Sequence, residues 1–417
     1  MKISQPKSSV RYFLVMIQAC LLMFAVALGA TALGFFVAPV TEELGFSRSA
    51  FTLYVSIYNV TSIIAMPFVG RMITKVGIRK VIFIGGIVVA AGFGGFAMSS
   101  SLISFYVAAA VFGLAIFGTT NLAAVIIVNT WFIKNKGAIL GIVMACSGVS
   151  GAILGVVMPG FIANNGWCAG YWALAVAFLV CTIPGSVFLL KDKPSDVGLK
   201  PYGSAENAGD SSASAAHTTE ASGISYASAM KMPQLYMIYI SIVLLGTTLS
   251  VLQHLPAHFT GIGMTGAQAG SLLSVLMIGM IITKILLGVL NDKLGSIIVV
   301  IIVTALTTVS LFAFNVPTYT VLAFSMAAFA FGSGSQTIIP PLITGQVFGQ
   351  KDYSKIWSTI VTAVSLGNVI GTPSWGAVYD LTGSYSLGIY ISICFVVLSG
   401  ILYIICLKSE TKKVNAL

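Results

Sequence analysis

Charge is the scarcest property of this sequence. Only 8% of its 417 residues are Asp, Glu, Lys or Arg, whereas 57% are hydrophobic, and the mean hydropathy is +1.00. A soluble domain carries about 25% charged residues, so the composition excludes one and indicates a chain that crosses a membrane many times. The net charge is +10, but no basic stripe with interleaved aromatic residues accompanies it, which argues against a nucleic-acid partner.

Cysteine is scarce and unpatterned as well. The six cysteines are scattered without a CxxC pair, and we interpret them as small buried hydrophobic residues, with no metal centre and no cofactor expected. The signatures GxSxG, HExxH and GxxxxGK followed by Ser or Thr are absent. Their absence argues against an enzyme and against an ATP-driven pump formed by this chain alone.

Long apolar runs are abundant. About 20 apolar residues cross the roughly 30 Å hydrocarbon core of a bilayer, and twelve such windows can be drawn. They cover about residues 12–40, 49–70, 81–99, 102–131, 138–162 and 171–190, and then 234–256, 267–290, 297–314, 319–348, 356–379 and 387–407. We therefore expect an all-α membrane protein whose twelve transmembrane helices form two six-helix bundles, residues 1–190 and 233–417.

The segment between the two bundles, residues 191–232, has a different composition. It is rich in Ser, Ala, Gly and Asp, cannot bury a core, and is predicted to be a flexible cytoplasmic linker.

The positions of the basic residues predict the orientation of the chain in the membrane. Nineteen of the 21 Lys and Arg lie on the side of the two termini, which leaves Arg48 on the other side and Lys284 within a span. The positive-inside rule then makes both termini cytoplasmic.

A basic, glycine-bracketed segment occurs twice, 218 positions apart. In both copies we expect the first Gly to close an apolar helix, with a second Gly seven positions on. The copies are Gly70-Arg71-Met-Ile-Thr74-Lys75-Val-Gly77-Ile-Arg79-Lys80 and Gly288-Val-Leu-Asn-Asp292-Lys293-Leu-Gly295-Ser296. The pair resembles the loops between helices 2 and 3, and 8 and 9, of major facilitator superfamily transporters. The resemblance implies that fold, a conformational role for both motifs, and a bacterial inner-membrane location. Thr74 departs from that family, which usually has an acidic residue there.

Glycine and proline inside the spans predict close packing and interruptions. The spacing Gly137-x3-Gly141 is typical of helices that approach closely. Pro159 and Pro373 fall in corresponding spans of the two halves and predict that both helices are interrupted there.

Proton-coupled drug exporters of the superfamily carry a Gly-Pro pair in the fifth helix. Here Gly155 is followed by Val156, which argues against that group.

Lys284 is the one charged residue that falls well inside a predicted span. It lies eight residues before Asp292, about 12 Å deep at 1.5 Å per residue. A lysine there costs about 2.5–3.5 kcal/mol and usually faces a partner or a water-filled cavity. None of the eleven acidic residues falls well inside a predicted span, so an anionic substrate is favoured as its counter-ion. A snorkelling lysine and one neutralised by a lowered pKa are the alternatives.

The place of Lys284 resembles that of the carboxylate-binding residue of monocarboxylate transporters and oxalate/formate antiporters. Those families normally use Arg, so Lys284 keeps the charge but loses the two-pronged hydrogen bond. Oxalate/formate antiporters add a basic residue in the eleventh helix, near Ile360 here, and this sequence lacks it. The single positive centre therefore favours a substrate with one carboxylate over oxalate.

Other polar residues are expected at the depth of Lys284. They are Tyr54, Tyr58, Asn121, Gln336 and Asn368, which we interpret with Lys284 as substrate-binding residues. Each of them could instead bond a neighbouring helix or a backbone carbonyl.

Three roles are open for His254 and His258: an interfacial polar cap, proton carriers, or a metal pair.

The function predicted from the sequence is secondary active transport of a small organic anion, a monocarboxylate above all, by alternating access. Symport and anion exchange both remain open. We expect a monomer whose partners are that anion and the lipid bilayer. The alternatives are a proton-driven exporter of amphipathic compounds, a channel, and a sensor that does not transport.

Overall fold

The computed structural model describes residues 6–29, 32–204 and 223–414. Over these residues the chain is helical, without β-strands apart from two isolated bridges. The spanning helices of the first half are α1 (Pro6–Gly29), α3 (Arg48–Val76), α4 (Ile78–Ala97), α5 with α6 (Leu102–Phe117 and Ala123–Trp131) and the two arms of α7 (Lys136–Pro184). Those of the second half are α9 (Pro233–Leu249), α11 (Gly266–Leu294), α12 (Ser296–Ala313), α13 (Tyr319–Phe348), α14 with α15 (Tyr353–Ile360 and Thr362–Thr382) and α16 (Ser386–Val414).

Short helices connect these spans. They are α2 (Val37–Leu44), α8 (Tyr226–Ala229), α10 (Leu255–Gly261) and single 3-10 turns at Ala32–Phe36, Pro194–Val197 and Ser250–Gln253. Two π-helical turns, Gly118–Leu122 and Gly185–Leu189, interrupt or end spans of the first half.

Six spans in each half confirm the predicted all-α fold of twelve transmembrane helices. Ten helices of the described residues are long and apolar enough to cross a membrane. One of them, Lys136–Leu189, has 54 residues and can cross twice, because its backbone turns at Gly166 (φ 81°, ψ 162°). The helix α15, continued from α14, supplies the remaining span.

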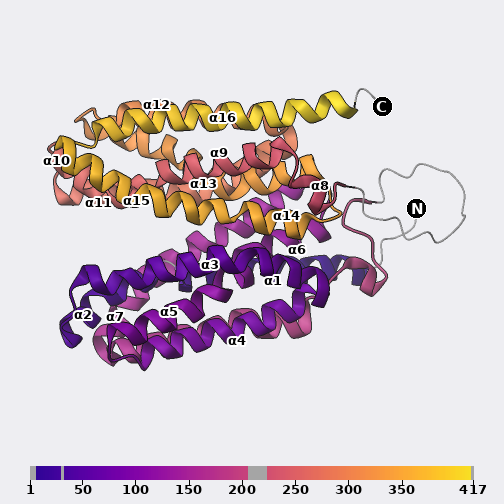
Figure 1. The fold of residues 1–417 in the computed structure, drawn as a ribbon, viewed down its shortest axis with the longest axis horizontal. Helices are drawn as coiled ribbons and strands as arrows, with labels where there is room; N and C mark the ends of the chain where they lie inside the picture. Colours follow the sequence, from indigo (N-terminus) through magenta and orange to yellow (C-terminus); the bar gives the residue numbers. More distant parts are fainter. Residues whose placement is uncertain (1–5, 30–31, 205–222, 415–417) are drawn as a thin grey trace, which may run out of the picture. The chain divides into compact units, whose positions relative to one another are not determined.

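The chain divides into two compact units. Of the described residues, unit 1 contains those up to Ile139, Cys146–Ser204 and Trp357–Thr359, and unit 2 contains Leu140–Ala145, Gly223–Ile356 and Ile360–Val414. Figure 1 shows the spanning helices of each unit side by side. Aromatic rings, among them Phe93, Phe96 and Phe112, form much of the core of unit 1. The core of unit 2 is mostly aliphatic and includes Phe259, Phe314 and Phe329, of which Phe314 contacts the other two rings.

The 218-residue repeat is visible in the backbone. Gly77 (φ 90°, ψ 153°) joins α3 to α4, and Gly295 (φ 80°, ψ 159°) joins α11 to α12. This conformation strains any residue with a Cβ, so glycine is required at both joints. The starts of α3 and α11 match too, because Ser47 and Thr265 each accept a hydrogen bond from the backbone N–H three residues on.

Two predictions about helix ends were wrong. Gly70 and Gly288 do not close their helices, since α3 continues to Val76 and α11 to Leu294. The residues after each glycine keep a helical backbone, and each helix ends only at the next glycine, Gly77 or Gly295, which has a positive φ. Likewise, α7 and α15 continue through Pro159 and Pro373. The break in the eleventh span lies earlier, at Val361, between α14 and α15.

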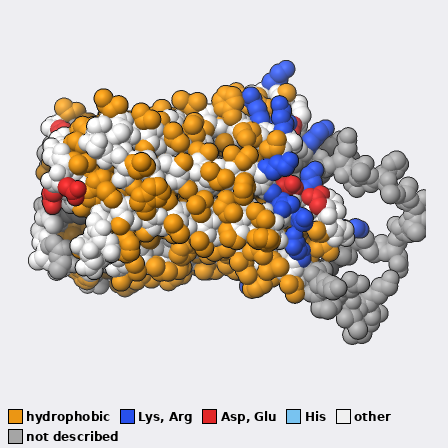
Figure 2. All heavy atoms as spheres, turned by 90° about the horizontal axis from the view of Figure 1, so that it is seen from below, with side chains coloured by type: hydrophobic (Ala, Val, Ile, Leu, Met, Phe, Trp, Pro, Cys, Tyr) orange, Lys and Arg blue, Asp and Glu red, His pale blue; other side chains and the backbone are white. Residues whose placement is uncertain are grey.

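The surface separates apolar helix faces from basic helix ends. In Figure 2 the Lys and Arg side chains form a band beside a mainly hydrophobic surface. The positions of these residues in the sequence agree with the figure, because basic residues follow α3, precede α7 and α9, and follow α13. This separation is typical of a protein with a lipid-facing body and one positively charged side.

Candidate functional site

Lys284 is buried on α11. Its side chain is 7% exposed, and its Nζ donates a hydrogen bond to the carbonyl oxygen of Met144 on α7 at 3.5 Å. Met144 lies in the segment Leu140–Ala145, which belongs to unit 2 together with α11. The structure thus keeps the lysine ammonium inside the protein, against a backbone acceptor. A carboxylate is a stronger acceptor than a peptide carbonyl and could take over this hydrogen bond.

Glycines on two neighbouring helices fix the turn of α11 that carries Lys284. A methyl group at Gly141 of α7 would stand 2.5 Å from the Lys284 carbonyl oxygen and 3.0 Å from the Cα of Ile285. On α13, a methyl group at Gly334 would stand 2.6 Å from Thr283 Oγ1. The spacing Gly137-x3-Gly141 marks a close approach in the sequence, but it does not name the partner helix. Sequence reasoning therefore missed the relation of Gly141 to Lys284.

Gln336 and Asn368, the other candidates in unit 2, are accessible to different degrees. Gln336 is half-buried, and its Nε2 has no hydrogen-bond partner among the described residues. It lies against the crossing of α9 and α15, where a methyl group at Gly367 would stand 3.0 Å from the Cα of Gly246. Asn368 is exposed. Unpartnered amide donors are what a polar ligand needs, so the geometry supports Gln336 as a candidate.

The candidates in unit 1 fall into two groups. Tyr54 is fully buried, its ring packs on Phe51 and Phe96, and its hydroxyl donates to the Leu33 carbonyl at 3.3 Å. Tyr58 is also buried and packs edge-on against an aromatic neighbour. These are the contacts of packing residues. Asn121 is half-exposed and lies in the π-helical turn Gly118–Leu122, an element often found at functional sites.

The two histidines lie just beyond the span Pro233–Leu252, and the rings of both lie next to the ring of Tyr385. The Nε2 of His254 lies 3.2 Å from the Thr372 carbonyl, and its Nδ1 lies 3.4 Å from the hydroxyl of Tyr385. The Nε2 of His258 lies 3.0 Å from the Phe314 carbonyl. Because a carbonyl only accepts, both rings carry a hydrogen on Nε2 when neutral. The contacts favour the polar-cap alternative, and the described residues contain no group of three metal-ligating side chains.

We expect His258 to make the protein less stable in acid. Burial lowers the pKa of His258, which lies beyond the end of the span Pro233–Leu252, below its ordinary value of 6.5. The unfolded chain then binds the proton first, so the stabilisation is complete above pH 6.5 and is lost as the pH falls toward the lowered pKa. His258→Gln keeps a donor for the Phe314 carbonyl but does not titrate. Its Tm should therefore fall less than that of the wild type between pH 8 and pH 5; parallel curves would contradict the prediction.

In the first loop motif, Arg79 and Asp192 join α4 to the end of the sixth span. Arg79 donates from Nε to the Ser186 carbonyl at 3.0 Å and from Nη2 to the Val187 carbonyl at 2.8 Å. The Asp192 carboxylate accepts from the backbone N–H of Arg79 at 3.0 Å. Arg79 thus caps the end of the sixth span, and Asp192 caps the start of α4. Sequence reasoning missed Asp192, which lies 113 positions further along the chain.

Removing the carboxylate of Asp192 should loosen this joint. We expect Asp192→Ala to lower the free energy of unfolding by about 1 kcal/mol, since it removes a charged cap from α4. Asp196→Ala is the matched control, because the carboxylate of Asp196 accepts from the backbone N–H of Lys193 within its own turn, Pro194–Val197. Thermal unfolding in detergent measures both. Equal Tm values for the two variants would show that Asp192 does not hold α4.

Each end of the predicted linker is held by its own bundle; residues 205–222 lie outside the described residues. In unit 1 the backbone N–H of Tyr202 donates to the Trp131 carbonyl at 2.8 Å. In unit 2 the carboxylate of Asp352 accepts from the N–H of Tyr226 and from Lys355, both at 2.8 Å. The Lys355 ammonium lowers the pKa of Asp352 below its usual range, and the N–H of Tyr226 adds to this effect. Trp131 ends the fourth span of the first half, and Asp352 lies just after the fourth span of the second half.

Comparisons with known proteins identify the family. The model of the Major Facilitator Superfamily matches residues 19–265 and 236–416, which together cover nearly the whole chain. The protein belongs to the Major Facilitator Superfamily. It is therefore a membrane transporter and not an enzyme.

The relatives of this superfamily member are distant in sequence. An MFS-type transporter of Gibberella moniliformis (strain M3125 / FGSC 7600) is 24% identical over 332 residues, which cover 76% of this chain and 72% of the relative. The uncharacterized MFS-type transporter YcxA of Bacillus subtilis (strain 168) is 25% identical over 166 residues, 38% of this chain and 40% of YcxA.

Solved structures of two transporters share the fold. The proton:xylose symporter XylE has a TM-score of 0.72 at 13% identity and covers 94% of this chain and 95% of its own. The transporter FucP in the outward conformation has a TM-score of 0.69 at 15% identity, with coverages of 95% and 99%. At these identities the likeness concerns the fold alone.

Proposed function

We propose that this superfamily member is a secondary active transporter of a small organic anion with one carboxylate, and that Lys284 binds the carboxylate. The observation that carries the proposal is a buried ammonium about 12 Å along α11 from Asp292, on a turn fixed by Gly141 and Gly334. A lysine at this depth in a span is costly and is usually functional. The single charge suits a monocarboxylate, as does the resemblance to monocarboxylate transporters.

The binding step follows from the chemistry of Lys284. A carboxylate that reaches the ammonium offers a charge-assisted hydrogen bond, about twice as strong as one to a neutral acceptor such as the Met144 carbonyl. Gln336 and Asn368 of unit 2 can donate to other oxygens of the substrate, which favours a hydroxy- or keto-acid. Neutralisation of Lys284 then lowers the cost of closing a dry cavity around the site, so that loaded transporters change conformation more readily than empty ones.

The coupling is proposed to be anion exchange or symport with a proton carried by the substrate. The contacts of His254 and His258 support a polar cap instead of a proton carrier. The xylose and proton named for XylE are not carried over, because 13% identity shows the fold alone. The basic helix ends support an orientation with both termini in the cytoplasm, which we propose for the inner membrane of a bacterium.

Uptake into proteoliposomes tests the proposed function. A panel of labelled monocarboxylates, with oxalate and xylose as comparison substrates, is offered with and without internal substrate and with an imposed pH gradient. Accumulation of a monocarboxylate that internal anion or the gradient stimulates is the expected result. Uptake of xylose alone would overturn the proposal and favour a sugar transporter. Uptake of no anion under any condition would also overturn it, and would favour the exporter of amphipathic compounds.

A further inference from the structure

Thr283, the residue before Lys284, joins α11 to α13. Its side chain is 3% exposed, and its Oγ1 donates a hydrogen bond to the Ala330 carbonyl of α13 at 2.9 Å. A second carbonyl oxygen, that of Met280 in its own helix, lies at 3.4 Å. Because a hydroxyl has one hydrogen, the shorter bond, which crosses between the helices, takes it. The residue beside Lys284 is therefore bonded to a neighbouring helix.

The two helices are in close contact at this bond. A methyl group at Gly334 of α13 would stand 2.6 Å from Thr283 Oγ1 and 3.5 Å from the backbone nitrogen of Lys284. The glycine leaves room for the hydroxyl, so α11 and α13 meet here through one threonine on one glycine. This joint holds the backbone of Lys284 against α13, the helix that also carries Gln336.

The first half has the same kind of joint, but further from the counterpart of Lys284. Ser62 of α3 shares its hydrogen between the Gly113 carbonyl of α5 at 2.6 Å and the Tyr58 carbonyl of its own helix at 2.7 Å. These helices are the second and fourth spans of their half, as α11 and α13 are of theirs. Ser62 lies about one turn before Met66, which is 218 positions before Lys284. Only in the second half does the hydroxyl lie directly beside this position, where the residue is charged.

We propose that Thr283 is a positioning residue for the anion site. Its bond to the Ala330 carbonyl holds the turn of α11 from which Lys284 reaches the carboxylate. The inference rests on the proposed function, because it assigns to this turn the task of presenting the ammonium to the anion. Without the hydroxyl, α11 can shift against α13 and the ammonium is no longer held in one place. A hydrogen bond between membrane helices is worth a factor of about 3 to 20 in an equilibrium constant, so its loss is measurable.

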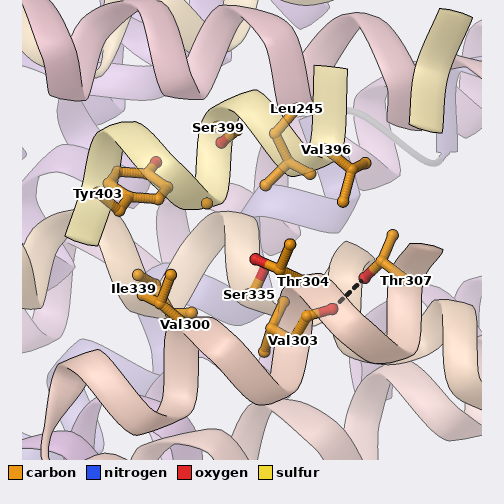
Figure 3. A pocket seen from close by; sticks show the side chains of 11 residues that line it. Leu245, Val300, Val303, Thr304, Thr307, Ser335, Ile339, Val396, Ser399 and Tyr403 are labelled. Atoms are coloured by element: carbon orange, nitrogen blue, oxygen red, sulfur yellow. Dashed lines mark hydrogen bonds between the residues drawn. The ribbon is translucent and has the colours of Figure 1, made fainter. Parts of the chain in front are cut away.

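Four proteins separate this role from helix packing: the wild type, Thr283→Val, Thr283→Ser and Thr307→Val. Thr283→Val removes the hydroxyl and keeps the shape of the side chain, whereas Thr283→Ser keeps the hydroxyl. Thr307 is the matched control on α12, which also packs on α13. It is fully buried, and its Oγ1 would stand 2.5 Å from a methyl group at Gly332 of α13. It donates to the Val303 carbonyl of its own helix at 2.7 Å (Figure 3), so Thr307→Val breaks no bond between helices.

The reactivity of the Lys284 amine tests its position without any substrate. The full chain in lipid nanodiscs is treated briefly with acetic anhydride, and mass spectrometry gives the acetylation of Lys284 relative to the exposed Lys231. Thr283→Val should raise this ratio about fivefold, because the amine then leaves its buried place more often. Thr283→Ser and Thr307→Val should match the wild type. A ratio that is unchanged in Thr283→Val, or raised equally in Thr307→Val, would overturn the proposal.

Anion uptake in proteoliposomes tests the consequence for the site. Thr283→Val should raise the KM of the transported monocarboxylate about fivefold and leave kcat unchanged, and Thr283→Ser and Thr307→Val should keep both constants. An unchanged KM beside a raised acetylation ratio would show that the turn moves without effect on the anion, against the positioning role. If the wild type takes up no anion, the proposed function fails, and the acetylation ratio still decides whether Thr283 holds Lys284. Thr283→Ala removes the same hydroxyl and replaces Thr283→Val if that variant does not fold.

Discussion

Lys284→Gln is expected to reduce monocarboxylate transport about a hundredfold at low substrate concentration, since loss of a charge-assisted hydrogen bond costs about 3 kcal/mol. Glutamine keeps a donor of similar length, so the variant removes the charge and little else. Lys284→Arg should retain a substantial part of the activity because it keeps the charge. Initial rates of labelled uptake in proteoliposomes give the ratio of kcat to KM for each variant.

The control for this prediction is Lys231→Gln, an exposed lysine before α9. It removes the same charge from the chain without touching the site, and its rates should match the wild type. A Lys284→Gln variant that transports as fast as Lys231→Gln would make Lys284 a structural residue. If the KM of Lys284→Gln rises while kcat is unchanged, the lysine binds the anion equally in the ground and transition states. If both worsen, neutralisation of the lysine also permits the conformational change.

The sequence predicted the fold because its evidence is global. Twelve apolar windows, 19 basic residues on one side and a repeated loop each point to the same architecture, and no single residue decides it. The repeat is exact enough that Gly77 and Gly295 share one backbone conformation. Helix ends were predicted less well, because the polar residues after Gly70 and Gly288 are compatible with both a loop and a helix that extends beyond the bilayer.

The candidate site was only partly predictable, since its contacts join residues that are distant in the chain. Lys284 is evident from sequence alone, as a charge in an apolar window. The Met144 carbonyl is not, because backbone acceptors leave no signal in side-chain patterns, and it lies 140 residues away. Asp192 was missed because its partner is the backbone N–H of Arg79, which leaves no such signal either and lies 113 residues away. Tyr54 shows the opposite failure: a tyrosine at the right depth could be ligand or core, and only packing distinguishes the two.

Gly141→Ala is expected to disturb the site more than its size suggests. The added methyl group would stand 2.5 Å from the Lys284 carbonyl oxygen and 3.0 Å from the Cα of Ile285, and backbone atoms cannot rotate away as a side chain can. Overpacking of this kind costs about 1–3 kcal/mol. We therefore expect a lower Tm and, since the turn that carries Lys284 must shift, a weaker affinity for the anion.

Gly155→Ala separates this effect from helix propensity. Gly155 lies on the same helix, and a methyl group there meets nothing within 4 Å. Alanine favours a helix over glycine by up to about 1 kcal/mol, so this variant should be as stable as the wild type or slightly more so. Thermal unfolding and anion binding are measured on both variants. If Gly141→Ala also gains stability and binds the anion normally, then α7 does not constrain the turn of Lys284, and Lys284 is positioned by α11 and α13 alone.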